Sequence, residues 1–383
     1  LAELITRGTA NKTPEEPENA IETLGASINA YATKEAIVIS GNTLSKNYSA
    51  TMALVQEILL EPRWDENEFE LLKQSTLAQI KRQKAQPNSI AVTEFDKLIY
   101  GENNILSNNN LGTEDSVNSI SIDDLKEYYN SFVSPTVAKV HVVGNISKDE
   151  VITSLAKVNE NLSTKSVEFP QLEYPESISA SQIYFYDVPD SKQSVLRIGY
   201  LALAATDTDY YAAQLLNYRL GGGGFASQLT QQLREGKGYT YGIRSNFSGT
   251  VLKGPFTISS SVRSNVTYES VSLIKEIMAN YGETFSDNDL EITKGYMIKS
   301  NARAFETLRS KLNMLTNMSA YGYPNDYVKQ HEDIVKTILV EDIKSLADKY
   351  LNPNQMIYLV VGDAKTQMDK WSEVGLGKPI LLN

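Results

Sequence analysis

The side chains that most often perform acid–base and metal chemistry are scarce in this sequence. Its 383 residues include two histidines, His141 and His331, and no cysteine. Without cysteine there is no disulfide, no thiolate zinc site and no cysteine nucleophile. Neither histidine has a partner at the spacing that would place two imidazoles on one helical face, so we interpret both as structural residues. Histidine-based catalysis confined to this chain is therefore not expected.

A second candidate is the glycine run Gly221–Gly224, which is followed by Phe225 and Ala226. It formally fits the dinucleotide-binding pattern G-x-G-x-x-A. In that fingerprint the glycines follow a strand, whereas here they follow a predicted helix over 209–220. No Lys-Ser or Lys-Thr pair comes next, which excludes a P-loop. We interpret the run as a loop that exploits the conformational freedom of glycine.

Composition and charge narrow the function classes further. Hydrophobic residues make up 41% of the chain, and 22 tyrosines and 10 phenylalanines exclude pervasive disorder. No stretch approaches the roughly 18 apolar residues of a membrane-spanning helix. The net charge of −11 opposes nucleic acid as a partner, because phosphate binding needs a basic face. Solubility explains the acidity most simply, and a cavity that favours basic peptides is the alternative.

An internal repeat organises the elements that must position any site. The segment Asp123–Asn145 recurs as Glu341–Asp363, and Trp64–Lys73 recurs as Phe285–Lys294, in the same order. A period above 200 residues indicates a duplicated domain and not a solenoid. The halves are predicted as residues 1–165 and 183–383, joined by a linker over 166–182. The second half has two predicted strands before its helix over 209–220, and the first half begins inside the matching helix, so the first domain is expected to lack its leading strands.

The patterning predicts an α+β fold, with a mostly antiparallel sheet in each domain and helices packed on one face of it. Runs of β-branched and aromatic residues predict strands, and apolar residues at helical spacing predict helices. The predicted strands cover 37–39, 137–143, 184–188, 195–203 and 256–262. The predicted helices of the second half cover 209–220, 266–281, 288–305 and 340–350.

Several segments together resemble the pitrilysin/insulinase-type zinc peptidases, and within them the mitochondrial-processing-peptidase-like branch. These segments are Arg7–Thr13, Leu24–Ala26, the glycine-rich run Leu220–Leu229, and Leu-Arg-Glu-Gly-Lys-Gly-Tyr-Thr-Tyr over 233–241. The resemblance covers essentially the whole chain. It implies two homologous domains, the second of the inactive type.

The resemblance also implies where catalytic residues would stand in an active member. Such a member carries H-x-x-E-H, in which two histidines bind zinc and the glutamate is the general base, and a further glutamate ligand lies downstream. Aligned on Gly8–Thr9, the base position holds Ala2, the second histidine position holds Glu3, and the distal ligand position holds Gln79. Loss of a general base alone typically costs a factor of about 10² to 10⁴. We therefore predict no metal and no other cofactor in this chain.

What the sequence retains is a pair of residues that the resemblance assigns to substrate binding. In the family, the C-terminal domain offers an Arg and a Tyr, seven residues apart, to the substrate at the facing zinc site, and Arg234 and Tyr241 match that spacing. Arginine presents a fixed fork of donors, and a tyrosine hydroxyl can stabilise an oxyanion. From the residues alone, the alternative is that Arg234 pairs with Glu235 and that Tyr241 is a core strand residue.

The resulting hypothesis is a non-catalytic subunit of a heteromeric zinc metallopeptidase. Its partner would be a homologous chain with an intact H-x-x-E-H motif, which would hold the zinc. An unfolded peptide would be captured by addition to a sheet edge. The alternative is a scaffold or binding protein that kept the fold without proteolysis, whereas an enzyme active by itself would require a different alignment. A bacterial extracytoplasmic (periplasmic) setting fits a cysteine-free chain of this kind.

Overall fold

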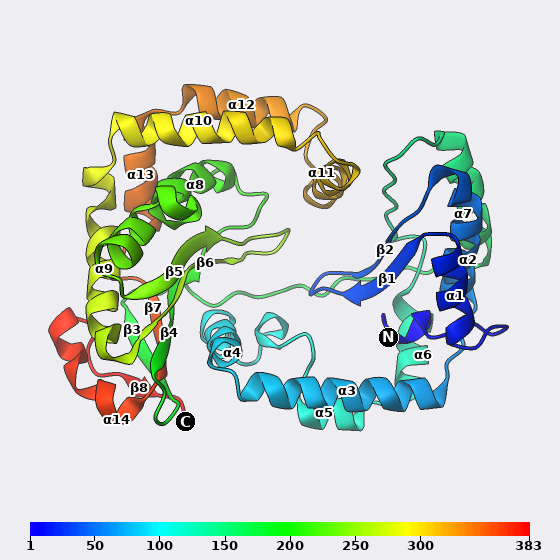
Figure 1. Cartoon of the computed structure of the whole chain (residues 1–383), viewed down its shortest axis with the longest axis horizontal. Coiled ribbons are helices and arrows are strands. Elements are labelled where there is room, and N and C mark those ends of the chain that lie inside the picture. Colours follow the sequence, from blue (N-terminus) through cyan, green and yellow to red (C-terminus); the bar gives the residue numbers. More distant parts are fainter. The chain divides into compact units, whose positions relative to one another are not determined.

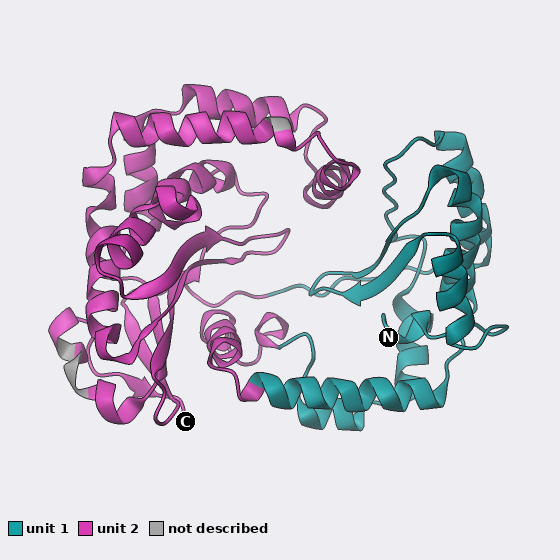
Figure 2. Cartoon of the chain, in the orientation of Figure 1, with its two compact units in different colours: residues 1–83, 109–172 teal, residues 84–108, 173–383 magenta. Residues whose placement is uncertain are grey.

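The computed structural model describes residues 1–301, 303–368, 371 and 373–383, and it confirms the α+β class. The chain forms two compact units (Figure 2). Unit 1 comprises Leu1–Gln83 and Asn109–Leu172, and unit 2 comprises Lys84–Asn108 and Glu173–Asn383. The sequence predicted a single boundary at 166–182, whereas the packing assigns residues 84–108 to the unit that holds the C-terminal half.

Unit 2 is built on a six-stranded sheet with the order β5-β6-β4-β7-β3-β8 (Figure 1). Its strands are β3 (Gln182–Asp187), β4 (Gln193–Leu201), β5 (Thr240–Phe247), β6 (Pro255–Arg263), β7 (Ile357–Gly362) and β8 (Ile380–Leu381). The pairs β5–β6, β6–β4 and β4–β7 are antiparallel, and β3 is parallel to both β7 and β8. The predicted mostly antiparallel sheet is therefore present in this unit.

Helices cover one face of that sheet because their apolar residues recur at helical spacing. In α9, the side chains of Val271, Ile274, Met278 and Tyr281 line one stripe, and all four are buried. They join a single core with the inward residues of the strands. The helices of the C-terminal segment are α8 (Tyr210–Asn217), α9 (Thr267–Thr284), α10 (Asp287–Arg303), α11 (Leu308–Tyr321), α12 (Tyr327–Thr337), α13 (Val340–Tyr350) and α14 (Ala364–Gln367).

The second face of the sheet is covered by α4 (Pro87–Tyr100), a helix from the N-terminal half of the sequence. Its buried residues Ala91, Phe95 and Ile99 recur every four positions and pack against β4 and β7. The paired strand residues Val195 and Val361 are buried on this sheet, and apolar surface of this kind must be covered from water. The predicted helical layer on one face is therefore joined in this unit by a helix on the other face.

Unit 1 contains mostly helices and a two-stranded antiparallel sheet of β1 (Ser27–Ala32) and β2 (Ile37–Asn42). Its helices are α1 (Glu15–Thr23), α2 (Tyr48–Leu60), α3 (Glu66–Lys84), α5 (Glu114–Ser119), α6 (Ile122–Phe132) and α7 (Lys148–Asn161). The repeated segments take the same form in both halves, since α3 corresponds to α10 and α6 corresponds to α13. The internal repeat is thus structural as well as sequential.

The strand predicted at 137–143 is wrong, because these residues form turns and irregular backbone. The matching segment of the second half is β7, which lies between β3 and β4 and exchanges backbone hydrogen bonds with both. In the first half, residues 1–26 contain a short helical turn and α1 but no strand. A segment of strand-forming composition without neighbouring strands has no hydrogen-bond partners to hold it extended.

Across the described residues, every helix is too short or too polar to cross a bilayer.

Candidate functional site

The predicted site residues stand on an unusual piece of backbone in unit 2. Two π-helical turns, Tyr218–Gly222 and Thr230–Gly236, flank the glycine-rich loop, and Arg234 lies in the second of them. Segments of π-helix are rare and occur frequently at functional sites. The helix predicted over 209–220 is α-helical only as α8, which ends at Asn217. The backbone then continues as the first π-helical turn.

The turn that follows Arg234 is fixed by two nested backbone hydrogen bonds. The N–H of Gly238 donates to the carbonyl of Arg234 (3.0 Å), and the N–H of Tyr239 donates to the carbonyl of Leu233 (2.9 Å). Gly238 has a φ of +62°, a conformation that glycine adopts without steric cost and that is typical of a helix C-terminus. This turn joins the π-helical segment to β5, so Arg234 and Tyr241 lie at its two ends.

The Arg234 side chain is half-buried and makes two contacts. Its Nε lies 3.3 Å from Glu235 Oε1, and its guanidinium carbon lies 4.6 Å from the ring centre of Phe225. Both contacts hold the fork of N–H donors in place, and the stacked ring leaves its edges able to donate. The ion pair with Glu235 agrees with the structural alternative for Arg234. The contact with Phe225 was not foreseen, since it depends on how the glycine loop folds back.

Tyr241 lies on the surface and not in the core. Its side chain is 91% exposed, at an irregularity in the β5–β6 register between Thr240 and Ile243. Thr240 fixes this bulge, since its Oγ1 accepts from the N–H of Gly242 (3.0 Å) and donates to the carbonyl of Ser261 (2.7 Å). Bulges re-aim side chains. The hydroxyl of Tyr241 is therefore free to meet a ligand, and the core interpretation of this residue is wrong.

The outer edge of β5 is covered by side chains of this unit. Asn217 Nδ2 donates to the carbonyl of Ser245 (2.8 Å), and Gln214 Nε2 donates to that of Phe247 (3.1 Å). Ser245 Oγ donates back to Asn217 Oδ1 (2.5 Å). Gly221 lies so close to Ser245 that an added Cβ would stand 2.6 Å from its backbone nitrogen. A peptide strand cannot pair with carbonyls that are already bonded, so β5 is not an open template.

The glycine loop is tied to the helical layer by a buried ion pair. Arg219 Nη2 lies 2.6 Å from Asp289 Oδ1, at the start of α10, and Arg219 also donates to the carbonyl of Ala226. Asp289 accepts further hydrogen bonds from the N–H and hydroxyl of Ser286. Burial by itself would raise the pKa of Asp289, but the hydrogen bonds from Ser286 and Arg219 outweigh it and hold the pKa below its ordinary value. The loop that carries Phe225 is therefore anchored at both ends.

The positions that would hold zinc in an active homologue do not fit the metal. Ala2 is buried, while Glu3 and Gln79 are exposed. Neither alanine nor glutamine offers the imidazole or carboxylate donor that zinc needs, and one glutamate is no site. Among the described residues, His, Asp and Glu form no cluster of three or more that could bind a metal ion. Ala2, Glu3 and Gln79 therefore do not form a zinc site.

The two histidines occupy separate parts of the fold. His141 lies in the irregular segment that follows α6. His331, in α12, stacks on Tyr211 with ring centres 3.7 Å apart and planes 9° from parallel, and the edges of its ring meet Tyr323 and Tyr327. Burial lowers the pKa of His331, because the charged form loses hydration in this cluster. The structural interpretation of His331 is thus supported by its packing.

Replacing His331 with phenylalanine is expected to reduce the acid sensitivity of the fold. The unfolded chain takes up a proton near pH 6.5, whereas folded His331 takes it up only at lower pH, so stability falls as the pH drops through this window. Phenylalanine keeps the stack with Tyr211 and removes the proton. Urea unfolding above and below about pH 6.5 measures the slope. His141→Phe is the control. If the free energy of unfolding of H331F depends on pH as steeply as that of the wild type, His331 is not the source of the acid sensitivity.

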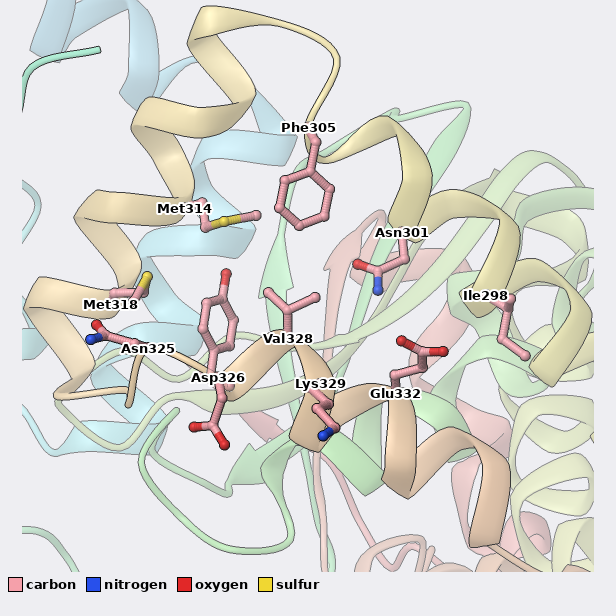
Figure 3. A pocket seen from close by; sticks show the side chains of 11 residues that line it. Ile298, Asn301, Phe305, Met314, Met318, Asn325, Asp326, Val328, Lys329 and Glu332 are labelled. Carbon is pink, nitrogen blue, oxygen red and sulfur yellow. The ribbon is translucent and has the colours of Figure 1, made fainter.

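Away from the Arg234–Tyr241 element, a hollow lies between α10, α11 and α12 (Figure 3). Its volume is about 560 Å³. The side chains of Phe305, Met314, Met318 and Val328 supply its apolar lining, and Asn301 and Glu332 lie among them. The lining also includes Asp326 and Lys329 but no histidine. Because no family residue maps to this hollow, the Arg234–Tyr241 element remains the candidate site.

The two halves of the sequence match two descriptions of one family. Residues 1–111 match "Insulinase (Peptidase family M16)", and residues 119–297 match "Peptidase M16 inactive domain". The second match contains both Arg234 and Tyr241. Between them the two matches cover most of the chain.

Individual relatives and solved structures agree with these matches. An "Uncharacterized zinc protease YmxG" of Bacillus subtilis is 26% identical over 317 residues, 82% of this chain and 75% of that protein. The "Non-peptidase homolog YmxG" of Helicobacter pylori is 22% identical over 370 residues, 95% of this chain and 84% of that protein. The crystal structure of a peptidase M16 inactive domain from Pseudomonas fluorescens superposes with a TM-score of 0.87 at 26% identity, and covers 94% of this chain and 87% of that one. More distant relatives include a probable mitochondrial-processing peptidase subunit beta of Arabidopsis thaliana, 22% identical over 271 residues, 68% of this chain and 51% of that protein.

Proposed function

Because this chain belongs to the insulinase family of M16 peptidases and their homologues, we propose that it is the non-catalytic subunit of a heteromeric zinc metallopeptidase. In this proposal Arg234 and Tyr241 act in trans on a peptide held at the zinc site of a homologous partner. The observation that carries the proposal is the exposure of Tyr241, 91%, beside an arginine that is held in place. A large aromatic side chain displayed at a bulge, with its hydroxyl free, is suited to contact a ligand.

The two side chains have different tasks in the proposed reaction. The guanidinium of Arg234 donates to a carbonyl oxygen of the bound peptide and orients it. The hydroxyl of Tyr241 donates to the oxyanion that develops when water adds to the scissile carbonyl. This chain supplies neither the nucleophilic water nor its base, since Ala2 stands at the position of the base. Zinc, when bound by the partner, polarises the carbonyl and the attacking water.

The proposed partner is a homologous chain with an intact H-x-x-E-H motif. A relative of this chain is a processing-peptidase beta subunit, a name that marks that protein as part of an assembly. We place both partners in an extracytoplasmic compartment, as the cysteine-free sequence predicts.

We further propose that the peptide is held as an extended strand. The carbonyls of β5 are occupied, so that edge cannot take it. In unit 1, β1 and β2 form a sheet of their own, and among the described residues each has one edge without a neighbouring strand. The edges of this small sheet are therefore sites where main-chain pairing with a peptide is possible.

The test is peptide cleavage by the purified partner mixed with wild-type or Arg234→Ala chain. We expect the variant to lower kcat/KM by about tenfold to a hundredfold, because a charge-assisted hydrogen bond of about 1.5 to 3 kcal/mol is lost. Arg82→Ala, which removes an exposed arginine of α3, is the matched control. Equal cleavage activity with R234A and with the wild type would contradict the proposal that Arg234 acts in trans on the peptide. A zinc content near one equivalent in this chain alone would contradict the proposal that only the partner binds zinc.

A scaffold without any proteolytic role is the second candidate. The ion pair between Arg234 and Glu235 favours it, because an arginine that already has a carboxylate partner can be purely structural. The same cleavage assay separates the two candidates. A scaffold predicts that the partner cleaves peptide equally well with wild-type and R234A chains, or without this chain.

A further inference from the structure

Three cationic residues lie in or beside the turn between Arg234 and Tyr241. Gly238 donates its N–H to the carbonyl of Arg234 (3.0 Å) and accepts at its own carbonyl from Arg263 Nη2 (3.3 Å). Lys237 is the neighbour of Gly238 in the chain. Arg263 comes from the far end of β6, and its N–H meets the carbonyl of Tyr239 (3.4 Å). We call Arg234, Lys237 and Arg263 the Gly238 cation cluster.

The cluster is short of negative charge. Lys237 and Arg263 are exposed, and the ion pairs found in the described part of the chain give the cluster one carboxylate, Glu235 on Arg234. Arg244 adds a further exposed cation on β5. It pairs with Ser259, which lies on the same face of β6 as Arg263 because side chains alternate along a strand.

This concentration of positive charge stands out against a net charge of −11 for the whole chain. Like charges gathered at one turn repel one another and cost stability unless a ligand compensates them. Arginine and lysine on an exposed turn recognise carboxylates through charge-assisted hydrogen bonds. The net negative charge of the chain disfavours nucleic acid and anionic lipid, which present many charges over a wide area.

Aromatic surface lies beside the charges. Phe225 is 61% exposed although its ring covers the guanidinium of Arg234, and Tyr241 is 91% exposed. Exposed rings next to cations suit a side chain that has an aliphatic stem and a charged end.

We propose that the Gly238 cation cluster is a subsite for the acidic side chains of an extended peptide. The proposal rests on the proposed function, because the peptide is the one that Arg234 and Tyr241 hold. Lys237 and Arg263 then determine specificity, and they select Asp or Glu near the bond that the partner cleaves. The net charge of the chain suggests the opposite preference, for basic peptides, but the local charge at the turn decides because charges beyond about 8 Å are screened at physiological salt.

The test compares two labelled, unstructured, C-terminally amidated peptides, one with several glutamates and one with glutamines at the same positions. Fluorescence anisotropy with the full chain alone gives both values of Kd. We expect the wild type to bind the glutamate peptide more tightly. Lys237→Gln and Arg263→Gln should each reduce the ratio of the two Kd values by about two- to fivefold, and the double variant should reduce it by about tenfold. Lys299→Gln, an exposed lysine of α10, is the matched control and should leave the difference unchanged.

Each other outcome overturns the proposal. Equal affinity of wild type for the two peptides, no binding of the glutamate peptide, or an equal effect of K299Q would show that the cluster is not an acidic subsite. A third peptide, the glutamine peptide with a free C-terminal carboxylate, tests the alternative ligand. If it binds more tightly than its amidated form, and the amidated glutamate peptide shows no advantage, the cluster binds a chain terminus instead. The binding assay needs no partner, so it is independent of the cleavage assay. If the wild type prefers the glutamate peptide but R234A leaves cleavage unchanged, the proposed function is refuted and the acidic subsite is not.

Discussion

Replacing Tyr241 with phenylalanine is expected to lower kcat of the mixed enzyme by about 10² to 10³ while leaving this chain as stable as the wild type. Loss of one donor to a developing oxyanion typically has this effect, about 3 to 4 kcal/mol in the transition state. The hydroxyl is solvent-exposed, and no hydrogen bond to it is found within the described residues, so folding loses nothing with it. KM should change little, because the oxyanion exists only in the transition state.

The measurement is single-turnover cleavage by the partner at saturating concentrations of Tyr241→Phe chain, together with a thermal melt. Tyr239→Phe removes a hydroxyl from the same turn, where the side chain is half-buried, and is the matched control. R234A should raise KM as well as lower kcat, since an arginine that orients the peptide also binds it in the ground state. A kcat for Y241F within a factor of about two of the wild type would assign Tyr241 to another role.

The repeat predicted which elements occur twice, but it could not predict which strands form. Asp123–Asn145 and Glu341–Asp363 have similar sequences, and in both copies the helix that begins the segment is present as α6 or α13. A helix satisfies its own backbone, so local sequence is enough to specify it. The strand that ends the segment depends on neighbours from elsewhere in the chain. In the second copy those neighbours are β3 and β4, which pair with 357–362, whereas residues 137–143 pair with no strand in the part of the chain that the structure describes.

The position of α4 shows the same limit for packing. Its sequence predicts a helix with apolar residues at regular intervals, yet nothing in that pattern indicates which sheet the helix covers. A helix can cover any sheet that offers a complementary apolar face, so chain order places residues 84–108 in the first domain whereas their packing places them in unit 2.

For the candidate site, sequence resemblance supplied the two residues and the structure supplied their surroundings. Arg234 and Tyr241 were identified by the resemblance and its seven-residue spacing, and their proposed roles remain predictions. The stacking of Phe225 on Arg234, the approach of Arg263 to Gly238 and the closure of the β5 edge by Asn217 all join segments that are distant in sequence. The one local signal that could have pointed to Phe225 was its position, an aromatic residue directly after four glycines in a loop expected to be exposed.

Replacing Asp289 with alanine is expected to destabilise the chain by about 3 to 5 kcal/mol, because it leaves the guanidinium of Arg219 without its partner in a largely buried place. The change also removes the acceptor of Ser286 at the start of α10. A double variant, Arg219→Met with Asp289→Leu, should recover much of the loss, since an apolar pair of similar volume avoids the cost of burying an unpaired charge. Urea unfolding of the single and double variants measures both effects.

The same variant should change the acid limb of stability and the function of the loop. The depressed pKa of Asp289 contributes stability that is complete above its ordinary value of about 3.9 and is lost as the pH falls through the lower, folded value. D289A should therefore lose less stability than the wild type over that range. Because Arg219 also holds the carbonyl of Ala226, next to Phe225, D289A should loosen the ring that covers Arg234 and raise KM in the cleavage assay under conditions where the variant is folded. An increase in KM for D289A that the double variant does not reverse would show that the Arg219–Asp289 ion pair, and not only the stability it contributes, keeps Arg234 in position for the peptide.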